Sequence, residues 1–185
     1  ILADDGLQHA RLGRDIEIEV IDGERGHGNG RLMPAGPLRE PPPRQVDFQV
    51  VNGGTAGEGQ WPMQLVLADA LPLSGGLARP LASFGGKSVH AVAGIGNPAR
   101  FFSALRAQGL QPVEHAFPGH HRFRAADLQF SPALPLLMTE KDAVKCAGFD
   151  LGSAYSVPVV AHLPPALFAA LCARLADWSP VHACA

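Results

Sequence analysis

Residues 89–109, VHAVAGIGNPARFFSALRAQG, predict a strand, a tight turn and a helix in succession. The run 89–93 is short and apolar, as a buried strand would be, and Gly94-Ile95-Gly96 ends it in a turn. Asn97 is a favoured helix N-cap, and Gly109 stands where helix C-termini prefer glycine. The helix between them would bury one apolar face made of Phe101, Phe102 and Leu105.

Further strands and a last helix are predicted outside this unit. The strand candidates are residues 1–3, 16–22, 48–52, 113–117, 134–139 and 157–163. Residues 63–73 are either a strand or one arm of a connection between domains, and 32–43 have room for one short helix. A helix opening at Pro164 would bury a row at helical spacing, namely Leu167, Phe168, Leu171, Leu175 and Trp178. Strands that alternate with helices predict an α/β architecture, with a largely parallel sheet in the second half.

Composition excludes several classes of function. The formal net charge is −2, and no basic run marks a nucleic-acid surface. No stretch approaches the roughly 20 apolar residues that span a bilayer. Three dispersed cysteines without CxxC spacing, Cys146, Cys172 and Cys184, favour a reducing cytosol over a disulfide framework. The sequence opens on Ile1-Leu2-Ala3 without a Met, so we expect a reading frame that is longer upstream.

An acidic pair is the first sign of chemistry. Asp4 and Asp5 follow the apolar opening residues, and adjacent carboxylates at a strand end suit Mg²⁺, which prefers anionic oxygen ligands. In P-loop enzymes an Asp at this place holds the metal that bridges the nucleotide phosphates. Taken alone, such a pair is more often a solvated turn than a metal site.

The wider context resembles the lipid A 4′-kinase family (tetraacyldisaccharide 4′-kinases). DDGLQH at 4–9 with RD at 14–15 is similar to that family's DDG(F/L)QH…RD signature. Further blocks follow in family order: Asp22, RGHGNG at 25–30, LMPAGPLRE at 32–40, NG at 52–53, GIGNPARFF at 94–102, FPGHHRF at 117–123 and TEKDAVKC at 139–146. Together they cover the chain from Ala3 to about Trp178.

The resemblance implies a fold and an activity. It implies a P-loop NTPase-like three-layer core, incomplete here at 1–62, a β linker at 63–86, a second and smaller α/β lobe at 87–178, and a tail at 179–185. The implied reaction transfers the γ-phosphate of ATP to the 4′-hydroxyl of a tetraacyldisaccharide 1-phosphate, which gives lipid IVA in lipid A biosynthesis. The implied active site lies between the lobes. The family sits peripherally on the cytoplasmic face of the bacterial inner membrane, through an N-terminal segment that this sequence lacks.

The resemblance also suggests roles for individual residues. It implies Asp4 and Asp5 as ligands of Mg²⁺, and Gln8 and His9 beside ATP. It places Arg39 and Glu40 near the phosphates or the sugar. The inter-lobe cleft would further include Asn97, Thr139, Lys141 and Asp142.

His120 is the catalytic candidate that the resemblance implies. The family's first His in this block pairs with an Asp from the absent N-terminal part, and the two form the base that activates the sugar hydroxyl. The family's Asp just before it is Gly119 here. No GxxxxGK[ST] loop, which binds the nucleotide phosphates in P-loop enzymes, occurs in the 185 residues. We therefore expect little or no kinase activity from this chain alone.

Two alternatives remain open at this stage. Gly94-x-Gly96-x-x-Ala99 follows a strand and opens a helix, and Glu114 lies 15 residues beyond Ala99, which approximates a Rossmann dinucleotide fingerprint. The other alternative is a non-catalytic remnant that binds a nucleotide or a lipid headgroup. Gly119 and the missing phosphate loop favour that second alternative.

Overall fold

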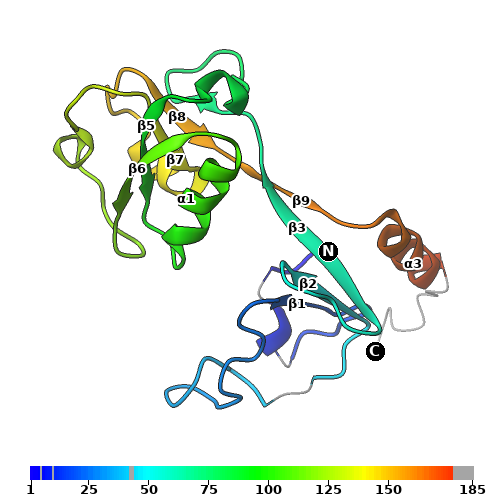
Figure 1. The fold of residues 1–185 in the computed structure, drawn as a ribbon. Coiled ribbons are helices and arrows are strands. Elements are labelled where there is room, and N and C mark those ends of the chain that lie inside the picture. The colour runs from blue at the N-terminus through cyan, green and yellow to red at the C-terminus, as the bar shows by residue number, and fades with distance from the viewer. Residues whose placement is uncertain (5, 10, 42–43, 177–185) are drawn as a thin grey trace. The chain divides into compact units, whose positions relative to one another are not determined.

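The computed structural model describes residues 1–4, 6–9, 11–41 and 44–176 and divides into two compact units (Figure 1). Unit 1 comprises Ile1–Leu65 and the segment from Ala161 onward, and unit 2 is Val66–Val160. The sequence-based divisions at 62/63 and 86/87 remain predictions. Trp178, the tail 179–185 and Cys184 lie outside the described residues.

Unit 1 contains a sheet in which β1 (Ile18–Asp22), β2 (Phe48–Asn52) and β3 (Gln60–Leu67) are parallel. The sheet has the order β1-β2-β3-β9, where β9 is Val159–His162. β1 pairs with β2 and β2 with β3 in parallel, with Val20 beside Val50 and Val50 beside Trp61. The strands predicted at 16–22 and 48–52 are therefore confirmed, the first of them two residues shorter.

Two local predictions for unit 1 were wrong. Residues 1–3 form no strand, because Ile1 and Leu2 are fully exposed and pair with no neighbouring strand in the described chain. A 3₁₀ turn, η1 (Gly6–Gln8), follows them. The described part of 32–43 holds turns and an isolated bridge between Leu32 and Leu38 instead of a helix.

Unit 2 contains a five-stranded sheet in the order β4-β8-β7-β5-β6. The strands are β4 (Leu71–Pro72), β5 (Ser88–Ala93), β6 (Gln111–Ala116), β7 (Leu136–Thr139) and β8 (Ala154–Val157). β6, β5, β7 and β8 are parallel, whereas β4 is antiparallel to β8. The prediction of a largely parallel sheet in the second half is confirmed, with β4 as the antiparallel strand. β8 was not predicted, because AYSV is too short to show a period.

The predicted strand–turn–helix unit is confirmed. α1 (Pro98–Ala107) follows β5, and the Asn97 side chain caps it by accepting a hydrogen bond from the Arg100 N–H at 3.4 Å. Phe101, Phe102 and Leu105 are all buried. Gly109 has φ +80°, a left-handed conformation that glycine adopts without steric cost, and this conformation ends the helix.

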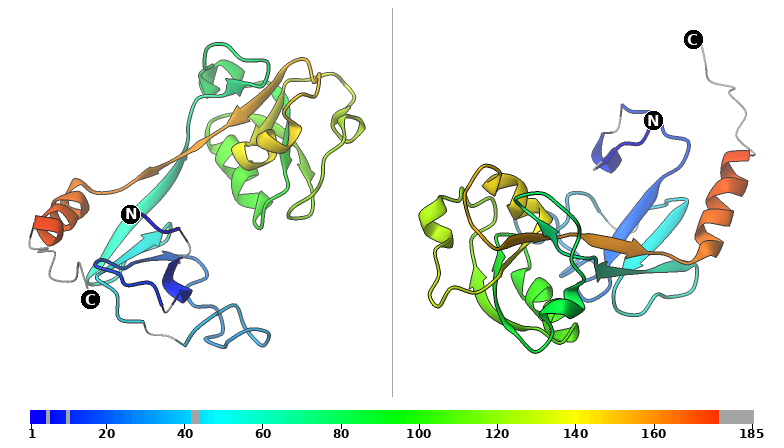
Figure 2. Two further views of the ribbon diagram at one scale, coloured as in Figure 1. Left: turned by 180° about the vertical axis from the view of Figure 1, so that it is seen from behind. Right: turned by 90° about the horizontal axis from the view of Figure 1, so that it is seen from above.

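Successive side chains of β5 point to opposite faces of the sheet and so belong to two different hydrophobic cores. Val89, Ala91 and Ala93 face α1 together with Phe84 of η2 (Leu81–Phe84). Val92 belongs to the other core, with Phe123 and Met138. That second core is covered by residues 117–135, which include η3 (Ala125–Leu128), and by α2 (Glu140–Ala143) and η4 (Val144–Cys146), drawn in yellow in Figure 2.

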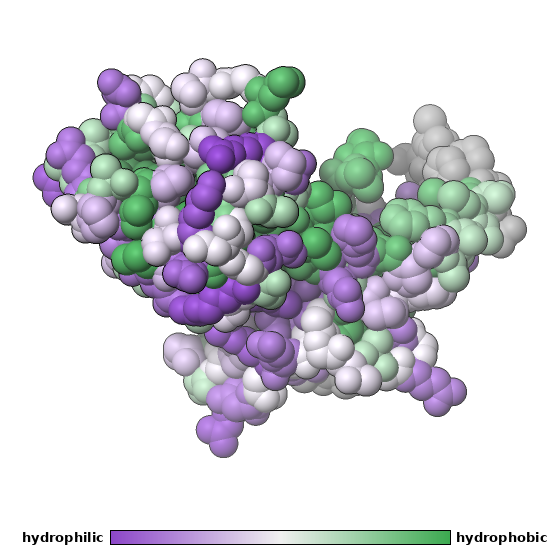
Figure 3. Space-filling view, turned by 45° about the horizontal axis from the view of Figure 1, so that its top comes forward, coloured by the Kyte–Doolittle hydropathy of each residue, from purple (hydrophilic) through white to green (hydrophobic). Residues whose placement is uncertain are grey.

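The last helix is exposed where burial was predicted. α3 (Pro165–Ala176) has Leu167 as its buried residue, whereas Phe168 is 54% exposed and Leu175 is 56% exposed. Figure 3 shows the surface of α3 as a pale green patch. The helix is apolar on most of its circumference, so its spacing could not identify which side contacts the rest of unit 1. No described helix is both long and apolar enough to cross a membrane.

Candidate functional site

Unit 2 has a topological switch point at the carboxyl end of β5. From β5 the chain passes through α1 to β6 on one side, and then returns to β7 on the other side of β5. In open α/β sheets, ligands bind in the crevice outside the carboxyl ends of strands where the direction of winding reverses. Three family-like blocks meet at this edge: residues 94–102 after β5, 117–123 after β6 and 139–146 at the end of β7.

A buried carboxylate joins two of these blocks. Asp142 is 0% exposed, and its Oδ2 accepts hydrogen bonds from the Gly94 N–H and the Thr139 hydroxyl, each at 2.7 Å. Its Oδ1 lies 2.7 Å from Lys145 Nζ. Burial by itself would raise the pKa of Asp142, but the hydrogen bonds from Lys145, Gly94 and Thr139 outweigh it, so the pKa lies below its usual value. Asp142 is therefore ionised at neutral pH.

The third block brings aromatic rings against this carboxylate. A Cβ placed on Gly94 would lie 3.5 Å from the Phe123 ring, and Lys145 Nζ lies 5.6 Å from the centroid of that ring. Phe123 meets Phe117 and His121 edge to face, with centroids 5.0 and 4.8 Å away. The carboxyl ends of β5, β6 and β7 are thus packed around one polar centre.

His120 stands beside this cluster in an unusual backbone conformation. In the described part of the chain it is the one non-glycine residue with a positive φ, +61°. Such a conformation costs free energy in a residue with a Cβ, and it concentrates at functional sites. The side chain is exposed, as a base acting on an external hydroxyl requires. His121 instead packs between aromatic rings, with Nε2 3.4 Å from Asp127 Oδ2.

The other predicted residues of unit 2 have simpler surroundings. Asn97 is half-buried and caps α1, while Lys141 is exposed on α2. Thr139 is 8% exposed and caps α2, because its Oγ1 accepts from the Asp142 N–H at 3.3 Å. A Cβ added at Gly119 would meet nothing within 4 Å, so the position before His120 has room for a side chain.

In unit 1, the DDGLQH block forms an exposed turn held by one arginine. Asp4, Gln8 and His9 are exposed around η1, and Asp5 lies outside the described residues. Arg14 Nη1 donates to the carbonyls of Gly6 and Leu7 at 2.9 and 3.1 Å. That guanidinium fixes the backbone of the turn and leaves the predicted functional side chains facing solvent.

An ion network extends from this turn to the LRE block. Glu17 accepts from Arg14 at 2.7 Å and from Arg44 at 2.8 Å, and Arg44 also reaches Glu40 at 2.7 Å. The Arg44 hydrogen bond is the main cause that lowers the pKa of Glu17, and Glu17 in turn raises the pKa of Arg44. The structure thereby brings Glu40 and the η1 turn into one network. Arg39, beside Glu40, is exposed.

The described residues offer a limited set of metal ligands. Within them, no three His, Cys, Asp or Glu side chains gather as a protein cage for a metal would require. Mg²⁺ does not need such a cage, because one or two carboxylates and the phosphates of the nucleotide are its usual ligands in phosphoryl-transfer enzymes. The exposed carboxylate of Asp4 fits that mode of binding.

Some residues of these networks received no role from the sequence. Arg14, Lys145 and Phe123 belong to quoted blocks, but nothing in the spacing of the blocks shows what they touch. Glu17 and Arg44 lie 27 residues apart and meet through the parallel pairing of β1 with β2. Sequence periodicity carries no signal for such a contact.

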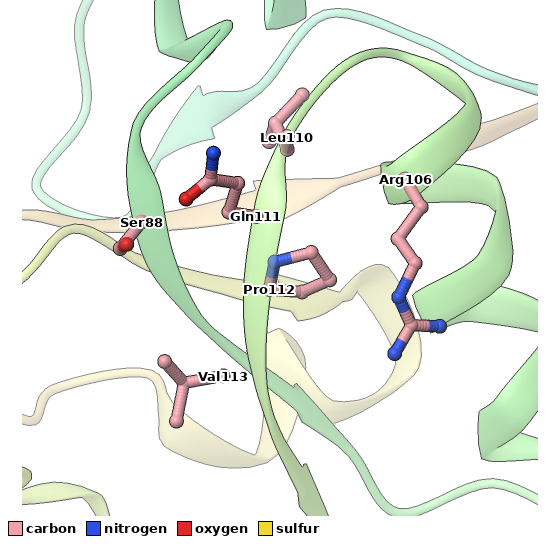
Figure 4. A pocket seen from close by; sticks show the side chains of 6 residues that line it. All are labelled: Ser88, Arg106, Leu110, Gln111, Pro112 and Val113. Atoms are coloured by element: carbon pink, nitrogen blue, oxygen red, sulfur yellow. The ribbon is translucent and has the colours of Figure 1, made fainter.

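A surface pocket of unit 2 lies away from this edge. It encloses about 410 Å³ and is lined by Ser88, Arg106, Leu110, Gln111, Pro112 and Val113 (Figure 4). Ser88 and Gln111 are the first residues of β5 and β6, so the pocket is at the amino ends of strands whose carboxyl ends carry the family-like blocks. We assign it no function.

The structure gives no support to a Rossmann-type dinucleotide site at Gly94 and Gly96. Glu114, which would bind a ribose, lies within β6 and forms an ion pair with Arg106 of α1. A Cβ added at Gly96 meets nothing within 4 Å. Glu114 is therefore already paired within the chain, and the open space at Gly96 by itself does not distinguish a dinucleotide site from a tight turn.

Comparisons with known proteins identify the same family that the sequence blocks resemble. The family described as Tetraacyldisaccharide-1-P 4′-kinase matches residues 1–176. Tetraacyldisaccharide 4′-kinase of Stenotrophomonas maltophilia (strain R551-3) is 55% identical over 191 residues, 97% of this chain and 56% of its own length. The protein of the same name from Xanthomonas campestris pv. campestris (strain 8004) is 53% identical over 194 residues, 95% of this chain and 55% of its own.

A solved structure shares the fold. The crystal structure of LpxK from Aquifex aeolicus in complex with ATP superposes with a TM-score of 0.66 at 23% identity, covering 91% of this chain and 55% of that one. The chain spans about half the length of the relatives it matches. Because the family match extends over nearly the whole described chain, this protein belongs to the tetraacyldisaccharide-1-phosphate 4′-kinase family.

Proposed function

We propose that this chain is the portion of a tetraacyldisaccharide 4′-kinase that supplies the catalytic histidine and part of the nucleotide and metal site. The reaction moves the γ-phosphate of ATP to the 4′-hydroxyl of a tetraacyldisaccharide 1-phosphate and yields lipid IVA for lipid A biosynthesis. The observation that carries the proposal is the family match across residues 1–176, with 55% identity to a named kinase. Peripheral attachment to the cytoplasmic face of the inner membrane belongs to the same proposal.

Tasks for the predicted residues follow from this proposal. Asp4 and Asp5 would hold Mg²⁺, which neutralises phosphate charge when it is bound. Gln8 and His9 would contact the nucleotide from the η1 turn. Further contacts with the phosphates or the sugar would come from Arg39, Glu40, Asn97, Thr139 and Lys141, with Asp142 at the same edge.

His120 would act on the acceptor. Its exposed imidazole takes the proton of the 4′-hydroxyl while that oxygen forms a bond to the γ-phosphorus, and the bond from phosphorus to the ADP oxygen breaks. Phosphoryl transfer depends chiefly on positioning and charge stabilisation. The positive φ of His120 supports this assignment, because the backbone is held in a costly conformation that presents this side chain.

A second candidate is a binding remnant without turnover. It is favoured by Gly119, which supplies no carboxylate to orient His120. Such a remnant would bind ATP or a phosphorylated headgroup through the same edge and release it unchanged.

A chimera separates the two candidates. The part of the Stenotrophomonas kinase that this chain does not cover would be joined to residues 1–176, and γ-labelled ATP supplied with tetraacyldisaccharide 1-phosphate. The kinase proposal predicts a labelled lipid phosphorylated at the 4′ position. A folded chimera that binds ATP and gives no labelled lipid would instead support the remnant.

A further inference from the structure

The carboxylate of Asp142 is placed to act through other residues. It is fully buried, and three donors from different parts of unit 2 already satisfy it: the Gly94 N–H, the Thr139 hydroxyl and Lys145 Nζ, each at 2.7 Å. A carboxylate with this set of partners has little capacity left for a nucleotide. Its effect on a ligand must come through the segments that it holds together.

One of these segments is the turn after β5. Gly94 has no Cβ, and this is why its backbone comes so close: an added Cβ would lie 3.1 Å from Asp142 Oδ1 and 3.4 Å from the Pro118 carbonyl oxygen. Pro118 also accepts a hydrogen bond from the His121 N–H at 3.1 Å. The hydrogen bond from Gly94 to Asp142 therefore fixes a backbone against which the loop 117–123 packs.

The second connection runs through Lys145. Its ammonium pairs with Asp142 and lies 5.6 Å from the centroid of the Phe123 ring, within range of a cation–π interaction. Phe123 is 7% exposed and contacts the His121 ring edge to face. A continuous chain of contacts thus leads from Asp142 to the residue next to His120.

We propose that Asp142, paired with Lys145, is a positioning residue that sets the loop 117–123, and with it His120, for phosphoryl transfer. The catalytic part of this inference rests on the proposed function. The geometric part does not, because it concerns contacts within unit 2. Removing Lys145 leaves the carboxylate of Asp142 buried without its charged partner, and removing the charge of Asp142 releases the Lys145 ammonium from its place beside Phe123, so either single change should disturb the loop.

The first test measures the loop in the 185-residue chain. NMR resonances of the His121 ring protons report their distance from the Phe117 and Phe123 rings. In D142N an amide group faces the Thr139 hydroxyl and the Lys145 ammonium, and we expect these resonances to move. K145M should move them as well. L105A is the matched control, because Leu105 belongs to the core on the other face of the sheet and its loss lowers stability without touching the loop.

The second test measures catalysis in the chimera described above. D142N and K145M should each lower kcat by about 10- to 100-fold, the range expected when a reacting group is displaced by about 1 Å. The KM for ATP should change less than kcat, and L105A should leave the kcat of the folded enzyme near that of the parent. His121 resonances that stay in place in both charge variants would overturn the inference.

The two tests fail in different ways. If the parent chimera has no activity, the proposed function fails, while the resonances still decide whether Asp142 sets the loop. If D142N does not fold, K145M provides the same comparison, because Lys145 is partly exposed and its loss leaves the hydrogen bonds of Gly94 and Thr139 intact. Displaced resonances together with unchanged kcat in K145M would reject the catalytic part alone.

Discussion

The carboxylate of Glu17 meets the guanidinium of Arg44 at two points, with Nη2 2.8 Å from Oε1 and Nε 3.3 Å from Oε2. The planar guanidinium matches a carboxylate in this two-point geometry. The same Glu17 holds Arg14, which fixes the η1 turn, and the same Arg44 holds Glu40. One carboxylate therefore organises both predicted site segments of unit 1.

Replacing this carboxylate should weaken unit 1 in a pH-dependent way. Arg44 lowers the pKa of Glu17 in the folded chain, so its stabilisation is present above the unfolded pKa and is lost as the pH falls through the folded pKa. E17Q should lower the free energy of unfolding at neutral pH by about 1 kcal/mol or less, because the network is partly exposed. Urea unfolding at neutral and acidic pH measures this, and the difference from the parent should shrink in acid. Equal effects of E17Q and of E58Q, a change at an exposed glutamate, would contradict it.

A pair of histidines, His90 buried and His115 half-buried, makes a second pH-dependent contribution. His90 Nε2 lies 2.9 Å from the Pro132 carbonyl oxygen, which can only accept, so that nitrogen carries the proton. His90 Nδ1 then accepts from His115 Nε2 at 3.0 Å, and His115 stacks on Phe130. Burial, with the nearby His90 as a lesser cause, lowers the pKa of His115.

The sign of the effect follows from this lowered pKa. Between the folded and unfolded pKa values the unfolded chain binds more protons, so stability rises with pH across that window and falls as the pH drops through it. H115Q keeps an N–H donor for His90 and removes the titration, and it should flatten the dependence seen in urea unfolding at a series of pH values. H162Q, at an exposed histidine of β9, should leave the dependence unchanged. A parent chain whose stability is flat across this window would count against the assignment.

The two glycines of the turn after β5 should respond differently to alanine. At Gly94 a Cβ would lie 3.1 Å from Asp142 Oδ1, which is tighter than an ordinary contact, whereas at Gly96 it would meet nothing within 4 Å. G94A should therefore destabilise the chain by about 1–3 kcal/mol, the range for overpacking, and G96A by less than about 0.5 kcal/mol. Thermal or urea unfolding of the two variants checks this. Equal losses would show that the contacts of Gly94 do not constrain the turn.

Gly119 can be tested by restoring the family's carboxylate. The position is open and its φ is not in the left-handed region, so G119D should leave the free energy of unfolding within about 0.5 kcal/mol of the parent. If a carboxylate there helps to orient His120, kcat of the chimera should rise. G119N supplies the same shape without charge and is the matched control. A rise of equal size in both variants would exclude a charge effect.

Local signals predicted much of the fold. Asn97 and Gly109 bounded α1 correctly because caps act through neighbouring atoms, and the runs at 48–52 and 89–93 became β2 and β5. The predictions failed where the outcome depends on distant partners. Residues 1–3 have a strand-like composition but find no strand to pair with, and α3 has apolar residues on most sides, so its spacing could not identify Leu167 as the buried one.

In the candidate site too, local patterns could be predicted from the sequence, whereas contacts between distant residues could not. Blocks of sequence that resemble the family predicted His120, Asp142 and Glu40 as site residues, and their roles stay predictions. Sequence did not show that Asp142 holds Gly94 from 48 residues away, or that Glu17 joins Arg14 to Arg44. Such contacts depend on strand order and register, which a local pattern does not contain.

The turnover of the chimera with and without the His120 imidazole tests the account most directly. The account predicts that the parent chimera phosphorylates the 4′ position of tetraacyldisaccharide 1-phosphate, and that H120A lowers kcat by about 100-fold or more, as expected for the loss of a general base, while remaining folded. H121A should retain more activity, because His121 faces aromatic rings instead of the acceptor. A folded H120A chimera with the kcat of its parent would contradict the account.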